Sequence, residues 1–114
     1  MNNPELIKTI RVLRRRGRGD APFWKAIADE LDKSKRKRVS VNIGVINRYS
    51  REGEIIAIPG KVLGSGNLTH PVTVAAFSFS STARRKIEDV KGRTVKLVDL
   101  PEMDPKPSAV RILK

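Results

Sequence analysis

The basic side chains have the clearest potential for chemistry in this sequence, and their spacing points to phosphate binding. Arg14, Arg15 and Arg16 are consecutive, and Arg18 follows two residues later. Adjacent residues on a helix diverge by about 100°, so three arginines fan around its axis and repel one another unless several anions surround them. Cations also suit a helix C-terminus, at about 0.3–1 kcal/mol each, which accounts for one or two of the four. We therefore predict that these four arginines contact phosphates.

A second run of basic side chains occupies residues 33–38, where the sequence reads Lys-Ser-Lys-Arg-Lys-Arg. Such a run cannot bury itself, so it should form a connector between folded parts. A solvated linker and a localisation-like basic tract are alternative interpretations, but we favour contact with nucleic acid. The predicted phosphate ligands of the connector are Lys35, Arg36, Lys37 and Arg38. Supporting contacts are predicted from Arg48, Lys61, Arg84 and Arg85.

The glycines of residues 60–66 invite comparison with a nucleotide-binding loop, because the sequence reads Gly-Lys-Val-Leu-Gly-Ser-Gly. A P-loop needs a lysine after its second glycine, followed by Ser or Thr, so that amides and an ammonium converge on the β- and γ-phosphates. Lys61 instead follows the first glycine, and residues 64–69 do not complete the dinucleotide-binding pattern. A turn beside an RNA backbone and a purely structural turn both remain open.

No group of side chains in the sequence is suited to catalysis or metal binding. The chain has no cysteine and one histidine, His70, which excludes disulfides, thiolate zinc sites and multi-histidine metal sites. His70 precedes a proline, which favours a surface loop. Glu52 and Glu54 lie in a hydrophilic turn, with no further carboxylate pattern for acid–base work. We therefore expect no catalytic residue, no metal and no cofactor.

Positive charge exceeds negative charge along the whole chain. Of 114 residues, 24 are Lys or Arg and 12 are Asp or Glu, for a net charge of +12; residues 1–50 carry 13 basic and 5 acidic residues. This excess indicates a polyanionic partner, with nucleic acid as the leading candidate. A DNA-binding or chromatin-architectural protein would carry similar charge, but no groove-entering motif is present. Only the glycines of residues 60–66 suggest an RNA-modifying or nucleotide-using enzyme.

The length fits one ordinary domain, or a small domain with an extension. No stretch approaches 18 consecutive apolar residues, and residues 1–3 lead into a charged helix rather than a signal peptide. We therefore expect a soluble, cytoplasmic protein with no membrane partner and no small-molecule substrate.

Helical periodicity near the N-terminus predicts a hairpin that presents the first arginine cluster. Asn3 can cap a helix, Pro4 suits its first position and Gly17 would end it. Its apolar face should comprise Leu6, Ile7, Ile10 and Leu13. A second helix should start from a cap at Asp20. It should bury Trp24, Ile27, Ala28 and Leu31, which places the indole in the core rather than on a base.

Valine, isoleucine and glycine dominate beyond residue 38 and predict strands. A short strand at residues 39–41 should lead into a helix capped by Asn42. One side of that helix should carry Val45, Ile46 and Tyr49. A strand at residues 55–58 should stop at Pro59 and Gly60. The longest strand should cover residues 72–79, with two covered faces formed by Val72, Val74 and Ala76 and by Thr73, Ala75, Phe77 and Phe79.

The last third of the sequence predicts one helix and two strands. Ser80 or Ser81 should cap a helix that ends at Gly92, buries Ala83, Ile87 and Val90, and carries the ion pairs Arg84–Glu88 and Arg85–Asp89 outside. Residues 94–100 and 110–113 should be strands, separated by an irregular spacer at 101–107. The succession of strands and helices predicts an α/β fold. We divide the chain into a basic helical hairpin with its connector at residues 1–38 and an α/β globular core at residues 39–114.

Four segments together resemble the archaeal and eukaryotic large-subunit ribosomal protein eighteen-e family, which is related to bacterial large-subunit ribosomal protein fifteen. They read Val-Asn-Ile-Gly-Val-Ile-Asn-Arg at 41–48, Ile-Pro-Gly-Lys-Val-Leu-Gly-Ser-Gly at 58–66, Val-Thr-Val-Ala-Ala-Phe-Ser-Phe-Ser at 72–80 and Ala-Arg-Arg-Lys-Ile at 83–87. Each segment is weak alone, but the second is specific in combination with the strand and serine-capped helix that follow. The resemblance covers essentially the whole chain, whose short length is similar to that of archaeal members.

This resemblance implies an irregular α/β core of the ββα-type superhelical kind with a basic helical extension. It also implies a structural constituent of the large ribosomal subunit that binds large-subunit rRNA, has neighbouring ribosomal proteins as partners and performs no catalysis. Charge alone indicates a polyanionic partner, but it does not indicate the ribosome.

Overall fold

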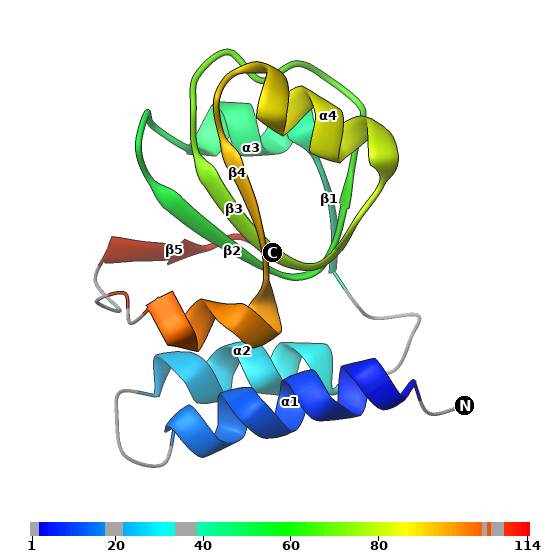
Figure 1. The fold of residues 1–114 in the computed structure, drawn as a ribbon, viewed down its shortest axis with the longest axis vertical. Helices are drawn as coiled ribbons and strands as arrows, with labels where there is room; N and C mark the ends of the chain where they lie inside the picture. Colours follow the sequence, from blue (N-terminus) through cyan, green and yellow to red (C-terminus); the bar gives the residue numbers. More distant parts are fainter. Residues whose placement is uncertain (1–2, 18–21, 34–38, 104, 106–108) are drawn as a thin grey trace.

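A parallel sheet between two helical layers forms the centre of the molecule (Figure 1). The computed structural model describes residues 3–17, 22–33, 39–103, 105 and 109–114. One layer contains α1 (Pro4–Gly17), α2 (Phe23–Leu31) and the 3-10 helix η2 (Leu97–Met103). The opposite layer contains α3 (Ile43–Tyr49) and α4 (Ser81–Asp89). The α/β class predicted from the sequence is confirmed.

The sheet is built around β2 (Ile55–Leu63), which lies beside three other strands. One edge of β2 pairs with β3 (Thr73–Phe79), which in turn pairs with β4 (Arg93–Lys96). The other edge of β2 pairs first with β5 (Val110–Ile112) and then with β1 (Val39–Asn42). Because all these pairings are parallel, the helices that connect the strands must cross over its faces.

The predicted stop at Pro59 and Gly60 is wrong, because β2 continues through both residues. The proline lies between the β5 and β1 pairings, where the register of β2 against β3 shifts between Ile58 and Lys61. A bulge is one of the few places in a strand that tolerates proline. Gly60 faces β1 so closely that an added Cβ would lie 1.9 Å from the carbonyl oxygen of Val39. The pair therefore marks a bend and a change of partner.

The helical hairpin forms as predicted, with one change on its apolar face. The Asn3 side chain accepts hydrogen bonds from the backbone N–H groups of Glu5 and Leu6 and so caps α1. Leu6, Ile10 and Leu13 are buried, as are all four residues predicted for α2. Ile7 is 39% exposed, contrary to the prediction, because it lies at the margin of the stripe. Asp20 lies outside the described residues.

The two short helices on the opposite face begin differently. The Ser80 hydroxyl accepts a hydrogen bond from the N–H of Ala83, which confirms the predicted cap of α4. Asn42 precedes α3, but its side chain makes no cap hydrogen bond there. Its carbonyl oxygen accepts from the N–H of Ser65 instead. Tyr49 is 51% exposed and does not join Ile46 in the core as predicted.

The predicted strand at residues 94–100 is too long. β4 ends at Lys96, and the chain turns into η2. Leu97 and Leu100 are buried three residues apart, which suits the three-residue period of a 3-10 helix better than the alternation of a strand. Pro101, inside η2, could not donate to a sheet. The turn brings η2 against α1.

Alternation along the strands divides the core into two clusters. Ala57 of β2 and Ala75 of β3 face the hairpin and pack with Trp24. Ile56 and Val74, their neighbours in the sequence, face α3 and α4. At the far end of β3, beyond the bulge, Phe79 packs with the second cluster, whereas Phe77 packs with the first. The predicted common face for these two phenylalanines is therefore wrong, because the sheet bends at the bulge.

Candidate nucleic-acid interface

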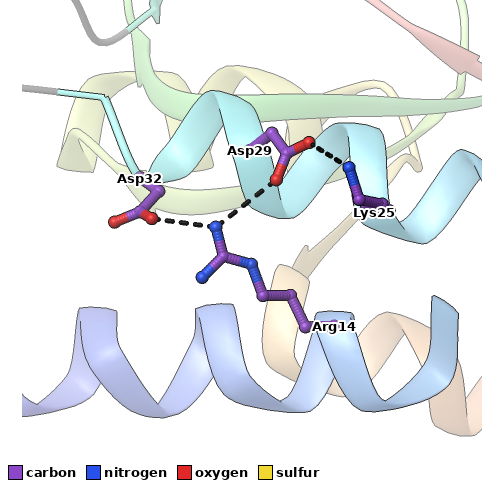
Figure 2. A network of polar contacts seen from close by, with 4 residues as sticks. All are labelled: Arg14, Lys25, Asp29 and Asp32. Carbon is purple, nitrogen blue, oxygen red and sulfur yellow. Dashed lines mark hydrogen bonds and ion pairs between the residues drawn. The ribbon is translucent and has the colours of Figure 1, made fainter. Parts of the chain in front are cut away.

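The arginines at the end of α1 differ in their surroundings. Arg14 points towards α2, where its guanidinium donates to Asp32 at 2.8 Å and to Asp29 at 3.4 Å (Figure 2). Lys25 also donates to Asp29, at 3.1 Å. These contacts fasten the two helices, although the groups are about half exposed and each pair contributes only about 0–1 kcal/mol. Arg14 is therefore committed to its own fold before any ligand arrives.

The ion pairs of the hairpin shift the titration of their members. Hydrogen bonds from Lys25 and then Arg14 hold the pKa of Asp29 below its usual value. The hydrogen bond to Asp32 is the main cause of the raised pKa of Arg14. Both shifts favour the charged forms, so the pairs persist at neutral pH.

Arg15 is exposed and Arg16 is partly buried, one residue further along α1 each. Within the part of the chain that the structure describes, Arg15 forms no ion pair. Arg18 and the connector residues Lys35, Arg36, Lys37 and Arg38 lie outside the described residues. The described part of the first predicted cluster thus offers Arg15 as a cation without an internal carboxylate partner.

The supporting cations predicted from the sequence occupy the other end of the molecule or the sheet. Arg48 belongs to α3, Arg84 and Arg85 belong to α4, and Lys61 belongs to β2. All four side chains are exposed. Figure 1 shows α3 and α4 at one end of the longest axis and the hairpin at the other, and that axis spans 36 Å. The predicted cations that the structure describes are therefore spread over the molecule and do not form one patch.

The ion pairs predicted along α4 do not form. Among the described residues, Arg84 and Arg85 make no ion pair with Glu88 or Asp89. The guanidinium of Arg84 instead lies over the ring of Phe79, 5.6 Å from its centroid. A guanidinium held against an aromatic face keeps its charge and its outer N–H donors available. Within the described chain, both arginines thus lack a carboxylate partner.

The glycine-rich turn at residues 64–66 is held by its own fold. The ammonium of Lys86 donates to the carbonyl oxygens of Gly64 and Gly66, both at 2.7 Å. The N–H of Gly44 donates to the carbonyl oxygen of Ser65 at 2.9 Å. Gly66 has a φ of +95°, and an added Cβ there would lie 2.6 Å from Cα of Gly44. These contacts favour the structural interpretation of the turn, in which a lysine binds carbonyls rather than phosphates.

Sequence analysis missed Lys86 because its partners are 20 and 22 residues away, and no local spacing signals such a contact. Arg11 was missed because it stands alone, one helical turn before the cluster. It is exposed on the same side of α1 as Arg14 and Arg15. Helical periodicity could have found it, since residues four apart share a face.

His70 is partly buried in a small polar cluster. Its Nε2 lies 2.9 Å from the hydroxyl of Ser50, and the neighbouring Thr69 donates from its backbone N–H to the side chain of Asn47. Among the described residues no carboxylate belongs to this set of contacts, so it lacks the third member of a hydrolytic triad. The described ranges also contain no group of three potential metal ligands, and no described helix has the length and apolarity to cross a membrane.

The family model of the ribosomal proteins 50S-L15 and 50S-L18e and their 60S counterpart matches residues 24–95. The match begins at the buried tryptophan of α2 and ends within β4, so it contains most of the sheet and both short helices. The chain belongs to this family. The resemblance drawn from the sequence is confirmed, and membership carries a structural, non-enzymatic role.

Relatives from archaea align with this family member over nearly its full length. The large ribosomal subunit protein eL18 of Methanothermobacter thermautotrophicus is 47% identical over 113 residues, which cover 98% of this chain and 93% of the relative. The protein of the same name from Methanospirillum hungatei is 44% identical, covering 99% and 94%. That from Methanococcus maripaludis is 46% identical, covering 97% and 93%. The N-terminal hairpin is therefore part of the similarity.

Proposed function

We propose that this chain is a structural component of the large ribosomal subunit that binds large-subunit rRNA through phosphate contacts. Its relatives carry the name of large-subunit proteins, and its net charge of +12 calls for a polyanion. Its partners are then that rRNA and the neighbouring ribosomal proteins. The role requires binding and rigidity and no reaction.

One observation supports the phosphate contacts above all. Arg15, Arg48, Lys61, Arg84 and Arg85 are exposed and, in the described ranges, none has a carboxylate partner. Unpaired surface cations gain most from RNA, because each neutralised phosphate releases condensed counterions. We include Arg14, whose contacts leave it half exposed, and Arg16. The proposal also retains the residues outside the described ranges, Arg18, Lys35, Arg36, Lys37 and Arg38.

The placement of these cations suits a protein that holds RNA segments together. The hairpin and the α3–α4 layer lie at opposite ends of a 36 Å axis. A molecule with cations at both ends can contact two RNA segments at once, whereas one continuous patch would bind one. Such contacts fix position and orientation, while selectivity comes from RNA shape and exposed bases.

A salt titration tests the proposed function. With about 6–10 phosphates neutralised, affinity for large-subunit rRNA should fall about 10³- to 10⁵-fold between 50 and 200 mM salt. Competition with duplex DNA should leave most of the protein on the rRNA. A flat salt dependence, or equal competition by duplex DNA, would contradict rRNA binding.

A pair of variants tests the unpaired cations of α4. Arg84→Ala with Arg85→Ala should lower the affinity at low salt and reduce the salt slope by about two. The matched control is Lys96→Ala with Lys114→Ala, which removes two charges that already pair with Glu5 and Glu30. Equal effects of the two double variants would show that net charge acts without regard to position, against the proposed contacts.

A further inference from the structure

A groove beside α1 combines apolar and cationic side chains. It has a volume of about 540 Å³ and is lined by Ile7, Ile10, Arg11, Arg14, Arg15 and Asp32. That volume falls within the range of about 300–1,000 Å³ that is usual for small-ligand sites. Five of the six residues come from one helix, at spacings of three and four residues, so they share one face. The sequence pattern of α1 therefore builds the groove, and Asp32 closes it from the end of α2.

The apolar part of the groove is unusual for an exposed position. Ile7 is 39% exposed, although it follows the buried Leu6 on an otherwise charged surface. Beside it, Ile10 is 8% exposed and belongs to the core. An apolar floor walled by guanidinium groups matches the two sides of a nucleotide, whose base has flat apolar faces and whose phosphate is an anion.

The charged groups of the groove differ in what they can bind. Asp29 and Asp32 already hold the guanidinium of Arg14 in place (Figure 2). Among the described residues, Arg11 and Arg15 have no such partner, so they are the cations available to a phosphate. The Asp32 carboxylate is about half exposed and repels anions. It can accept further hydrogen bonds from an N–H-bearing base edge.

We propose that this groove binds an unpaired nucleotide of the rRNA, with its base against Ile7 and Ile10 and its phosphates on Arg11 and Arg15. The inference rests on the proposed function and gives it a site that the arginine cluster alone did not indicate. The base presents its N–H donors to Asp32, which favours an edge with amino and imino groups. Recognition at this site therefore depends on an unpaired base and not on duplex RNA.

An acidic peptide is the competing occupant, since its carboxylates would also suit Arg11 and Arg15. The carboxylate of Asp32 weighs against it, because it would lie beside the ligand in a partly apolar groove. A nucleotide offers donors at one end and an anion at the other, and this polarity matches the arrangement of Asp32 and the two arginines. We therefore commit to RNA, and the test separates the two.

The test compares four single variants for binding to large-subunit rRNA. Ile7→Ser should reduce affinity about tenfold without changing the salt slope, because it removes apolar contact and no charge. Arg11→Ala should reduce both the affinity and the salt slope, by about one. Lys8→Ala is the matched charge control, exposed on the same helix but outside the groove. Met103→Ser is the apolar control, 38% exposed and remote from α1 in sequence.

Chemical probing of the bound rRNA supplies the second readout. One or a few unpaired bases should be protected by the wild type and by Lys8→Ala, and should become reactive with Ile7→Ser. Thermal melting of each variant verifies that the fold is retained; Ile7→Leu replaces any variant that fails to fold and should keep the protection.

The outcomes separate this inference from the proposed function. If the wild type binds rRNA but Ile7→Ser behaves like Met103→Ser and Arg11→Ala like Lys8→Ala, the groove is not a nucleotide site and the proposed function stands. Loss of a protein neighbour from reconstituted subunits, with rRNA binding intact, would assign the groove to a peptide and overturn the inference. If the wild type does not bind rRNA at all, the proposed function itself fails.

Discussion

Single side chains in this protein are constrained mainly by backbone that passes close to them. Gly60 touches the carbonyl of Val39, and Gly66 lies against Gly44. Lys86 holds the turn at residues 64–66 through two carbonyls. Charge at a given position is therefore a poor guide to its role, since Lys86 serves the fold whereas Arg84 and Arg85, one and two residues before it, are open to solvent.

Gly60→Ala should destabilise the fold by more than about 3 kcal/mol, because its Cβ would lie 1.9 Å from a backbone oxygen of β1 and the strands would have to separate. Chemical denaturation measures the free energy of unfolding. Gly44→Ala is the control, since its Cβ would meet Gly66 Cα at 3.4 Å, an ordinary contact. Equal midpoints for the two variants would mean that β1 and β2 are not this close.

Lys86→Met should lower the free energy of unfolding by about 1–2 kcal/mol, because two charge-assisted hydrogen bonds to Gly64 and Gly66 are lost at a partly buried site. The amides of residues 64–66 should also exchange faster with solvent. Lys61→Met, which removes an exposed ammonium from β2, serves as the control. Unchanged exchange in Lys86→Met would exclude the clamp.

At the scale of elements, each helix is fixed by one apolar face and a few polar fasteners. α2 buries Trp24 and Leu31 against the sheet, while its carboxylates hold neighbouring segments. Glu30 accepts from Lys114 at 2.7 Å and from Lys33 at 2.8 Å. The end of the chain is thereby fastened to the hairpin, far from it in sequence.

The fastener at Glu30 predicts a dependence of stability on pH. The hydrogen bond from Lys114, followed by that from Lys33, lowers the pKa of Glu30 from its usual value near 4.5. A lowered pKa in the fold means that the stabilisation is present above the unfolded-state pKa and is lost as pH falls through the folded-state pKa. Glu30→Gln should therefore lower the Tm by about 3 °C at pH 7, and the difference should vanish at about pH 3.

Thermal melting between acidic and neutral pH measures this effect. Glu88→Gln is the control, because within the described chain the Glu88 carboxylate has no ion-pair partner. A constant difference between Glu30→Gln and the wild type at all pH values would rule out the proposed linkage.

The whole molecule consists of a sheet with a separate apolar cluster on each face. The cluster under the hairpin joins Leu13, Trp24 and Leu31 to Leu97 and Leu100 of η2. We retain as a proposal the division into a basic hairpin with its connector at residues 1–38 and an α/β part at residues 39–114. The shared cluster makes the second part dependent on the first for the cover of one sheet face.

A fragment of residues 39–114 should therefore fail to unfold cooperatively and should aggregate. Each large side chain removed from the first cluster contributes about 1.5–3 kcal/mol of burial, and several are lost at once from a typical stability of about 5–15 kcal/mol. Circular dichroism melting and size-exclusion chromatography measure both properties against the full chain. A monomeric fragment with the melting temperature of the full chain would refute this dependence.

The sequence by itself determined the elements whose signals are local. Asn3 and Ser80 mark helix starts through hydrogen bonds within three residues, and the periodic apolar residues of α2 place Trp24 in the core. The α/β class and the family follow from the same local patterns. The net charge also indicated a polyanion, because charge is a sum that does not depend on the fold.

Only the tertiary structure decided the contacts between distant segments. It carried β2 through Pro59 because a bulge and two successive partner strands accommodate the proline, and it turned residues 97–103 into η2. It also used Arg14 and Lys86 as fasteners while leaving Arg84 and Arg85 without carboxylate partners in the described chain. Local spacing cannot reveal these outcomes, because they depend on distances between residues that the folding of the sheet alone brings together.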